Sequence, residues 1–139
     1  MGIASSVFFA NIGAAYGTSK ASIGIANLGM VDQSKILRSL IPVIMAGILG
    51  IYGLITAVLM VTKAKDADQK DGYKLFAAGL CCGLSALASG LAIGVAGEAG
   101  VRAYAQTEQI FVGMILILIF AEAIGLYGMI IAIIMITAS

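Results

Sequence analysis

The chain has 139 residues, of which 61% are hydrophobic and only 11% are charged. This composition lies outside the range of water-soluble domains and predicts an integral, multi-pass membrane protein. Its formal net charge of +1 supplies neither the basic surface that nucleic acid requires nor an acidic tail, so we expect membrane lipid, and no nucleic acid, as a partner.

Four long apolar segments follow one another along the chain, separated by polar stretches. Each is at or beyond the roughly 20 residues that a helix needs to cross a bilayer. Because backbone in lipid must satisfy its own hydrogen bonds, the pattern predicts an all-α membrane protein with four transmembrane helices and both termini on one side. We expect these helices at about Gly2 to Leu28, Ser39 to Val61, Gly72 to Tyr104 and Gln109 to Thr137.

The second and fourth segments resemble each other. MAGILGIYGLITAVLM (45–60) aligns without gaps on FAEAIGLYGMIIAIIM (120–135), and both contain the same Tyr-Gly pair. Self-similarity of this kind indicates a duplication. The sequence therefore predicts a duplicated two-helix hairpin, with residues 1–68 as the first hairpin and residues 69–139 as the second.

The first and third segments carry small residues on one helical face, and GAAYG in the first matches GLAIG in the third. Small residues let helix backbones approach closely in a membrane. One interpretation is packing within a single four-helix bundle; the continuous stripes favour another, the close packing of many copies side by side in a ring. The stripes are Ala10, Gly13, Gly17 and Gly24 in the first segment and Gly79, Gly83, Ala86, Gly90, Gly94 and Gly97 in the third.

Glu122 lies near the centre of the fourth segment, with no charged residue within two turns on either side. An ionised side chain there costs at least about 3 kcal/mol, so such a residue indicates function. The neutral acid can sit against lipid while the carboxylate needs water or a cation, which predicts a proton carrier. The alternative is a neutral acid that only hydrogen-bonds between helices. The equivalent position of the repeat is Gly47, so only one of the two repeats carries a carboxyl at this position, which leaves one such ionisable site per four helices.

Tyr52 is the candidate hydrogen-bond partner of Glu122. It lies on the equivalent helix, slightly beyond the level of Gly47, and its side chain leans back towards the depth of the carboxyl. The alternative is that Tyr52 serves only in packing. Tyr127, on another face of the helix that carries Glu122, is the weaker candidate.

Other polar groups in the apolar segments are less informative. Thr56, Ser85 and Ser89 are expected to bond the carbonyl one turn back on their own helices. The adjacent Cys81 and Cys82 are interpreted as small apolar residues, because further ligands for a metal are missing and a framework disulfide is not indicated. We expect neither a metal nor a cofactor.

Four stretches closely resemble one family, the c subunits or proteolipids of vacuolar-type proton-translocating ATPases. They run through all four predicted helices and are highly specific. The stretches are GAAYGT (13–18), IPVIMAGILGIYGL (41–54), GLAIGVAGEAGVRAYAQ (90–106) and FVGMILILIFAEAIGLYG (111–128).

This resemblance implies a ring of identical or paralogous c subunits in the V0 membrane sector, with the first and third helices inside and the others outside. Glu122 takes the position of the proton-carrying carboxylate. The ring would turn against the stationary a subunit, whose arginine favours the ionised form, and would contact the d subunit and the central stalk of V1. Since this chain has no GxxxxGK[ST] phosphate loop, ATP must be hydrolysed by partner subunits.

The resemblance also implies a vacuolar or other acidic endomembrane, with lumenal termini. Sodium-carrying relatives place polar ligands just before the tyrosine of the second helix, where this chain has Ile48 and Leu49. A dehydrated Na⁺ would need several oxygen ligands besides Glu122, so proton transport is favoured.

Two other functions remain as alternatives. A small four-helix proton-coupled transporter would need its glutamate on the first helix, an aromatic pocket and no hairpin repeat. A structural proteolipid pore would make Glu122 incidental, so that its removal would leave proton pumping intact.

Overall fold

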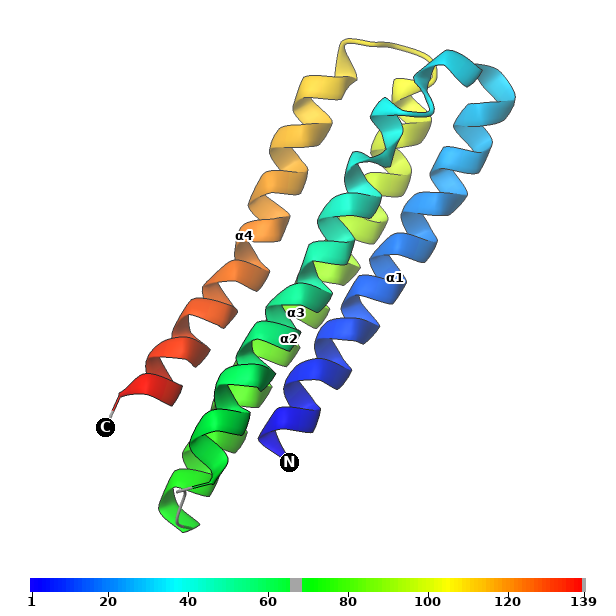
Figure 1. Cartoon of the computed structure of the whole chain (residues 1–139). Coiled ribbons are helices and arrows are strands. Elements are labelled where there is room, and N and C mark those ends of the chain that lie inside the picture. Colours follow the sequence, from blue (N-terminus) through cyan, green and yellow to red (C-terminus); the bar gives the residue numbers. More distant parts are fainter. Residues whose placement is uncertain (66–68, 139) are drawn as a thin grey trace.

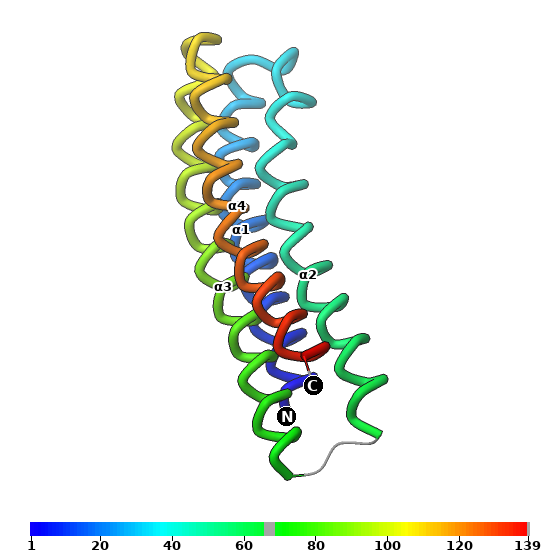
Figure 2. The backbone as a smooth tube through the Cα atoms, turned by 90° about the vertical axis from the view of Figure 1, so that its left-hand side faces the viewer, coloured from blue at the N-terminus to red at the C-terminus, as the bar shows by residue number. Residues whose placement is uncertain are grey.

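The computed structural model describes residues 1–65 and 69–138, and every regular element within them is helical. Both chain ends lie at one end of an elongated bundle, the terminal end, where α2 also ends and α3 begins (Figures 1 and 2). The opposite end of the bundle is called the loop end. The elements are α1 (Gly2–Val31), η1 (Gln33–Lys35), η2 (Arg38–Leu40), α2 (Ile41–Ala64), α3 (Gln69–Tyr104) and α4 (Ile110–Thr137).

The helix boundaries agree with the expected ones to within three residues. Pro42 lies in the first turn of α2, where its missing amide hydrogen breaks no helical hydrogen bond. The two short 3₁₀ helices between α1 and α2 were not predicted. They connect the two helices through residues that include Lys35 and Arg38.

Three of the described helical segments are long and apolar enough to cross a membrane: Arg38–Ala64, Gln69–Tyr104 and Ile110–Thr137. The sequence predicted four membrane-spanning helices, and these three are the ones that meet the criterion of length and apolar composition. The remaining helix, α1, is 30 residues long, but Asn11, Lys20 and several serines are spread along it, so it has no stretch as apolar as those of the other three.

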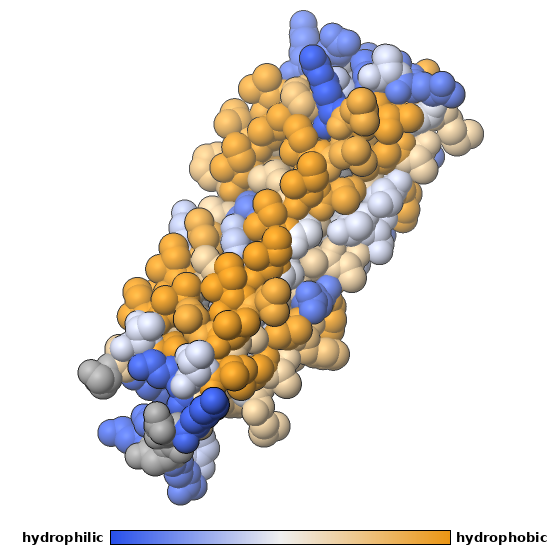
Figure 3. All heavy atoms as spheres, viewed as in Figure 1, coloured by the Kyte–Doolittle hydropathy of each residue, from blue (hydrophilic) through white to orange (hydrophobic). Residues whose placement is uncertain are grey.

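The outer surface is that of a membrane protein. Large apolar side chains project outwards from α2 and α4, with Ile44 59% exposed and Phe120 72% exposed. Apolar residues gather over the middle of the visible face, and hydrophilic residues gather towards its two ends (Figure 3). Lipid covers such a surface more favourably than water does, so the chain is an integral membrane protein.

The small-residue stripes of α1 and α3 face each other within one chain. A Cβ on Gly90 would overlap backbone atoms of Gly13, and a Cβ on Gly79 would overlap those of Gly2. The two helices run parallel along this seam, which is the most extensive helix contact in the bundle. The structure therefore accounts for both stripes by packing within one chain, and the packing of copies in a ring stays a prediction.

Lys35 joins the loop after α1 to the end of α3. Its ammonium donates a hydrogen bond of 3.0 Å to the carbonyl oxygen of Tyr104, the last residue of α3, and lies 4.9 Å from the centre of the Tyr104 ring. A carboxyl oxygen of Asp32 lies 3.8 Å from the same ammonium. A cation at a helix C-terminus satisfies a free carbonyl and interacts favourably with the helix dipole.

Replacing Lys35 by methionine should lower the stability of the folded chain by about 1–2 kcal/mol, because a charge-assisted hydrogen bond and a cation–π contact are lost. Thermal unfolding in detergent, followed by circular dichroism, measures the change. The control is Lys70→Met, at an exposed lysine of α3. An equal loss of stability in both variants would contradict the role given to Lys35.

Candidate functional site

Glu122 lies on the inner side of α4, where its side chain is only 9% exposed. Leu49 of α2 and Leu118 and Ala121 of α4 belong to the buried apolar cluster at this level. Both carboxyl oxygens are buried and lack a hydrogen-bond partner among the described residues. An unpaired buried carboxylate is costly, so this environment favours the neutral acid.

Two glycines bring α4 close to its neighbours just after Glu122. A Cβ on Gly125 would lie 2.7 Å from the Leu49 side chain and 3.4 Å from Cβ of Ser89. A Cβ on Gly128 would overlap the side chain of Ser85. The α4 backbone therefore reaches α2 and α3 only because these positions carry no side chain.

Ser89 of α3 forms a hydrogen bond with α4 at the residue before Glu122. Its hydroxyl donates a hydrogen bond of 2.6 Å to the carbonyl oxygen of Ala121, on the neighbouring helix. The expected bond to the carbonyl one turn back on α3 is therefore wrong for Ser89. It is correct for Thr56, whose hydroxyl donates to the carbonyl of Tyr52 at 3.0 Å. Sequence reasoning missed the role of Ser89, although its place beside Gly90 in the stripe was a usable signal.

Tyr52 lies close enough to Glu122 for the two side chains to interact electrostatically. Their arrangement lacks the geometry of a hydrogen bond, since neither carboxyl oxygen has a partner in the described part of the chain. The other candidate, Tyr127, is 63% exposed on the outer side of α4. The structure thus brings Tyr52, and not Tyr127, towards the buried side of the carboxyl.

The cysteines contact neighbouring helices. The thiol of Cys82 lies 3.2 Å from the Thr56 hydroxyl, and the thiol of Cys81 donates to the carbonyl oxygen of Gly128 at 3.6 Å. Both thiols are free. Within residues 1–65 and 69–138 there is no group of three His, Cys, Asp or Glu residues that could hold a metal ion.

The remaining glycines of the two stripes also lie where helices meet. Gly24 approaches the backbone of Glu98, and Gly97 approaches the ring of Pro42. By contrast, Gly47, the repeat partner of Glu122, faces open space. Gly17 lies against Ala46 and the backbone of Gly90, Gly83 against the backbone of Ser5, and Gly94 against Gly17 and Lys20.

Fold and site together define a class: a small α-helical membrane protein with a buried carboxyl in the membrane helix α4. The family model of the ATP synthase C subunit matches residues 1–60 and 76–135. The chain is also 52% identical over 139 residues to a V-type proton ATPase 16 kDa proteolipid c subunit, the one numbered 2, of Caenorhabditis elegans, with 97% of this chain and 86% of the relative covered.

Two further relatives have corresponding names. The V-type proton ATPase 16 kDa proteolipid c subunit of Ascaris suum is 53% identical over 141 residues, covering 97% of this chain and 86% of the relative. The Homo sapiens protein of that name is 51% identical over 140 residues, covering 99% and 89%. The chain therefore belongs to the ATP synthase C-subunit family, in its group of V-type proton ATPase proteolipids.

Proposed function

We propose that this chain is a proton-conducting c subunit in the V0 membrane sector of a V-type ATPase. The observation that carries the proposal is Glu122, a buried carboxyl in a membrane helix whose two oxygens have no hydrogen-bond partner in the described residues. Such a group is stable when neutral and needs an aqueous or cationic partner when ionised. Loss and gain of its proton can therefore be coupled to movement between two environments.

In the proposed mechanism, copies of the chain or close paralogues form a ring in which α1 and α3 face inwards and α2 and α4 face lipid. The exposed apolar side chains of α2 and α4 support this orientation. The ring turns against the stationary a subunit, whose arginine favours the ionised form of Glu122. The d subunit and the central stalk connect the ring to V1, where partner subunits hydrolyse ATP.

The chain itself is proposed to be a duplicated hairpin. The Ser6 hydroxyl donates a hydrogen bond of 3.0 Å to the carbonyl oxygen of Gly53. An equivalent bond joins the Cys81 thiol to the carbonyl oxygen of Gly128, and both of its partners lie 75 positions after those of the first bond. The two stretches matched by the family model differ by the same shift. Residue 68, the proposed end of the first hairpin, and residue 139, the end of the second, lie outside the described residues.

The GAAYG and GLAIG motifs do not fit this shift, because they are 77 positions apart. In the structure their first glycines, Gly13 and Gly90, contact each other across the α1–α3 seam. Their similarity is therefore better explained by shared packing than by an equivalent place in the two hairpins.

We further propose that α1 is the fourth span, since it runs parallel to α3 along its length (Figure 1). The membrane is vacuolar or another acidic endomembrane, and the terminal end faces the lumen. The experiment that tests the proposed function exchanges Glu122 for glutamine and measures ATP-driven acidification of membrane vesicles.

Tyr52 is proposed to hydrogen-bond Glu122 during transport. Replacing it by phenylalanine should slow ATP-driven acidification about fivefold, because a hydrogen bond of this kind contributes about 1 kcal/mol. The matched control is Tyr127→Phe, which removes a hydroxyl from the exposed side of α4 and should leave the rate unchanged. A native rate in the Tyr52→Phe complex would show that Tyr52 serves only in packing.

A further inference from the structure

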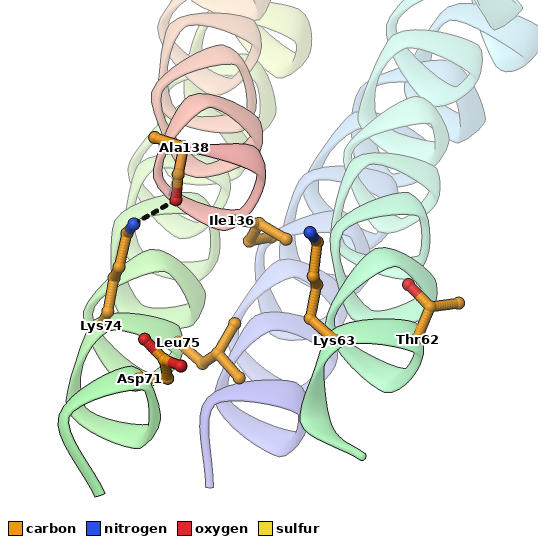
Figure 4. A pocket seen from close by; sticks show the side chains of 7 residues that line it. All are labelled: Thr62, Lys63, Asp71, Lys74, Leu75, Ile136 and Ala138. Atoms are coloured by element: carbon orange, nitrogen blue, oxygen red, sulfur yellow. Dashed lines mark hydrogen bonds between the residues drawn. The ribbon is translucent and has the colours of Figure 1, made fainter. Parts of the chain in front are cut away.

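A cavity of about 410 Å³ opens at the terminal end of the bundle, where α2 ends, α3 begins and α4 ends (Figure 4). Lys63 and Lys74 approach it from opposite sides, and Leu75 and Ile136 lie between them. The cavity is remote along the chain from Glu122 and takes no part in the proton chemistry proposed above. It therefore needs an explanation of its own.

The two lysines give the cavity anion-binding groups. Lys63 is exposed in the last turn of α2. Lys74 donates one hydrogen bond to the carbonyl oxygen of Ala138, and an ammonium has three donors, so this bond does not use all of them. Asp71 also lines the cavity, so among the described lining residues one negative charge accompanies two positive ones.

The position of the cavity relative to the membrane and its apolar lining indicate which kind of anion it would bind. The cavity is bounded by the last turns of α2 and α4, two helices that are able to span a membrane, and so lies at the boundary between hydrocarbon and water. Leu75 and Ile136 would favour acyl chain over water at its floor. Lysine ammonium groups bind phosphate as point charges, and the apolar side chains beside them suit the acyl chains that a lipid phosphate carries.

We propose that this cavity binds the phosphate group of an anionic phospholipid. Lys63 and Lys74 pair with the phosphate oxygens, and the upper part of an acyl chain lies against Leu75 and Ile136. The charges and the depth are the same whichever compartment the terminal end faces. The proposal is therefore independent of the proton-carrying role of Glu122.

The test measures lipid retained by the full-length chain, purified in detergent, by native mass spectrometry with added phosphatidylglycerol or phosphatidylcholine. The native chain should retain phosphatidylglycerol in preference. The double variant K63Q/K74Q should bind phosphatidylglycerol about 25-fold more weakly, since each lysine near a membrane surface contributes about fivefold. Circular dichroism checks that the variant keeps its helices.

The matched control is K65Q/K70Q, which removes two lysines from the same end that do not line the cavity. It should retain phosphatidylglycerol as the native chain does. Equal retention of both lipids by the native chain, or equal losses in the two double variants, would overturn the proposal. A third arm adds inorganic phosphate: displacement of the lipid at millimolar concentration would identify a site for free anions and contradict a lipid site.

Discussion

Replacing Glu122 by glutamine abolishes ATP-driven acidification in membrane vesicles that carry the variant in place of the native chain. The amide has nearly the shape of the neutral acid, so the apolar cluster around Leu49 and Leu118 stays packed and the complex assembles. The glutamine amide does not ionise, however, so a turning ring would carry no proton at this position. We expect acidification to fall to the background seen without ATP, with assembly checked on the purified complex.

The matched control is Glu98→Gln on α3. Glu98 pairs with Arg102 at 2.8 Å near the loop end, and the arginine side chain is 52% exposed. A partly exposed pair of this kind contributes little to stability, so acidification should remain close to the native rate. If the Glu122→Gln complex assembles and still pumps protons, the carboxyl is structural and the proposed function is wrong.

Replacing Gly90 by leucine destabilises the folded chain by at least about 3 kcal/mol, because overpacking forces the helices apart. Even the first carbon of the new side chain would overlap the backbone of Gly13. Backbone cannot move aside as a flexible side chain can, so the whole α1–α3 seam has to open. Unfolding in detergent, followed by circular dichroism, measures the loss, and the yield of folded chain should fall with it.

Gly113→Leu is the control for this prediction. Gly113 also lies in a helix, α4, but a Cβ there meets no atom within 4 Å. Leucine is the better helix former by close to 1 kcal/mol, so this variant should be as stable as the native chain or slightly more stable. Equal losses of stability in the Gly90→Leu and Gly113→Leu variants would show that Gly90 is not needed for close packing of α1 against α3.

Most of the fold could be predicted because a bilayer imposes strong rules on sequence. The length of the apolar segments and the polar breaks between them placed the helices. Glu122 was also evident, because a carboxyl in the middle of an apolar span costs free energy that only a function justifies. Its burial against α2 and α3 agrees with that interpretation, while its role as a carrier remains to be measured.

The partners of each helical face could not be predicted, because periodicity identifies a face but not the neighbour that covers it. The glycines of α1 and α3 therefore suggested contacts between copies, whereas Gly13 and Gly90 meet within one chain. Ser89 shows the same limit on a smaller scale. A hydroxyl can bond to its own helix or to an adjacent one, and only the closeness of α4 selects the Ala121 carbonyl.

The polar character of α1 has a consequence for how the protein is made. In the proposed four-span arrangement, α1 is synthesised before the other three helices and is the one least able to enter lipid unaided. Its principal neighbour, α3, is synthesised only after α2 has been completed. Membrane insertion of α1 is therefore expected to be cooperative, finished when α3 arrives to cover the α1 stripe at Gly13, and biogenesis should stall in chains truncated before α3.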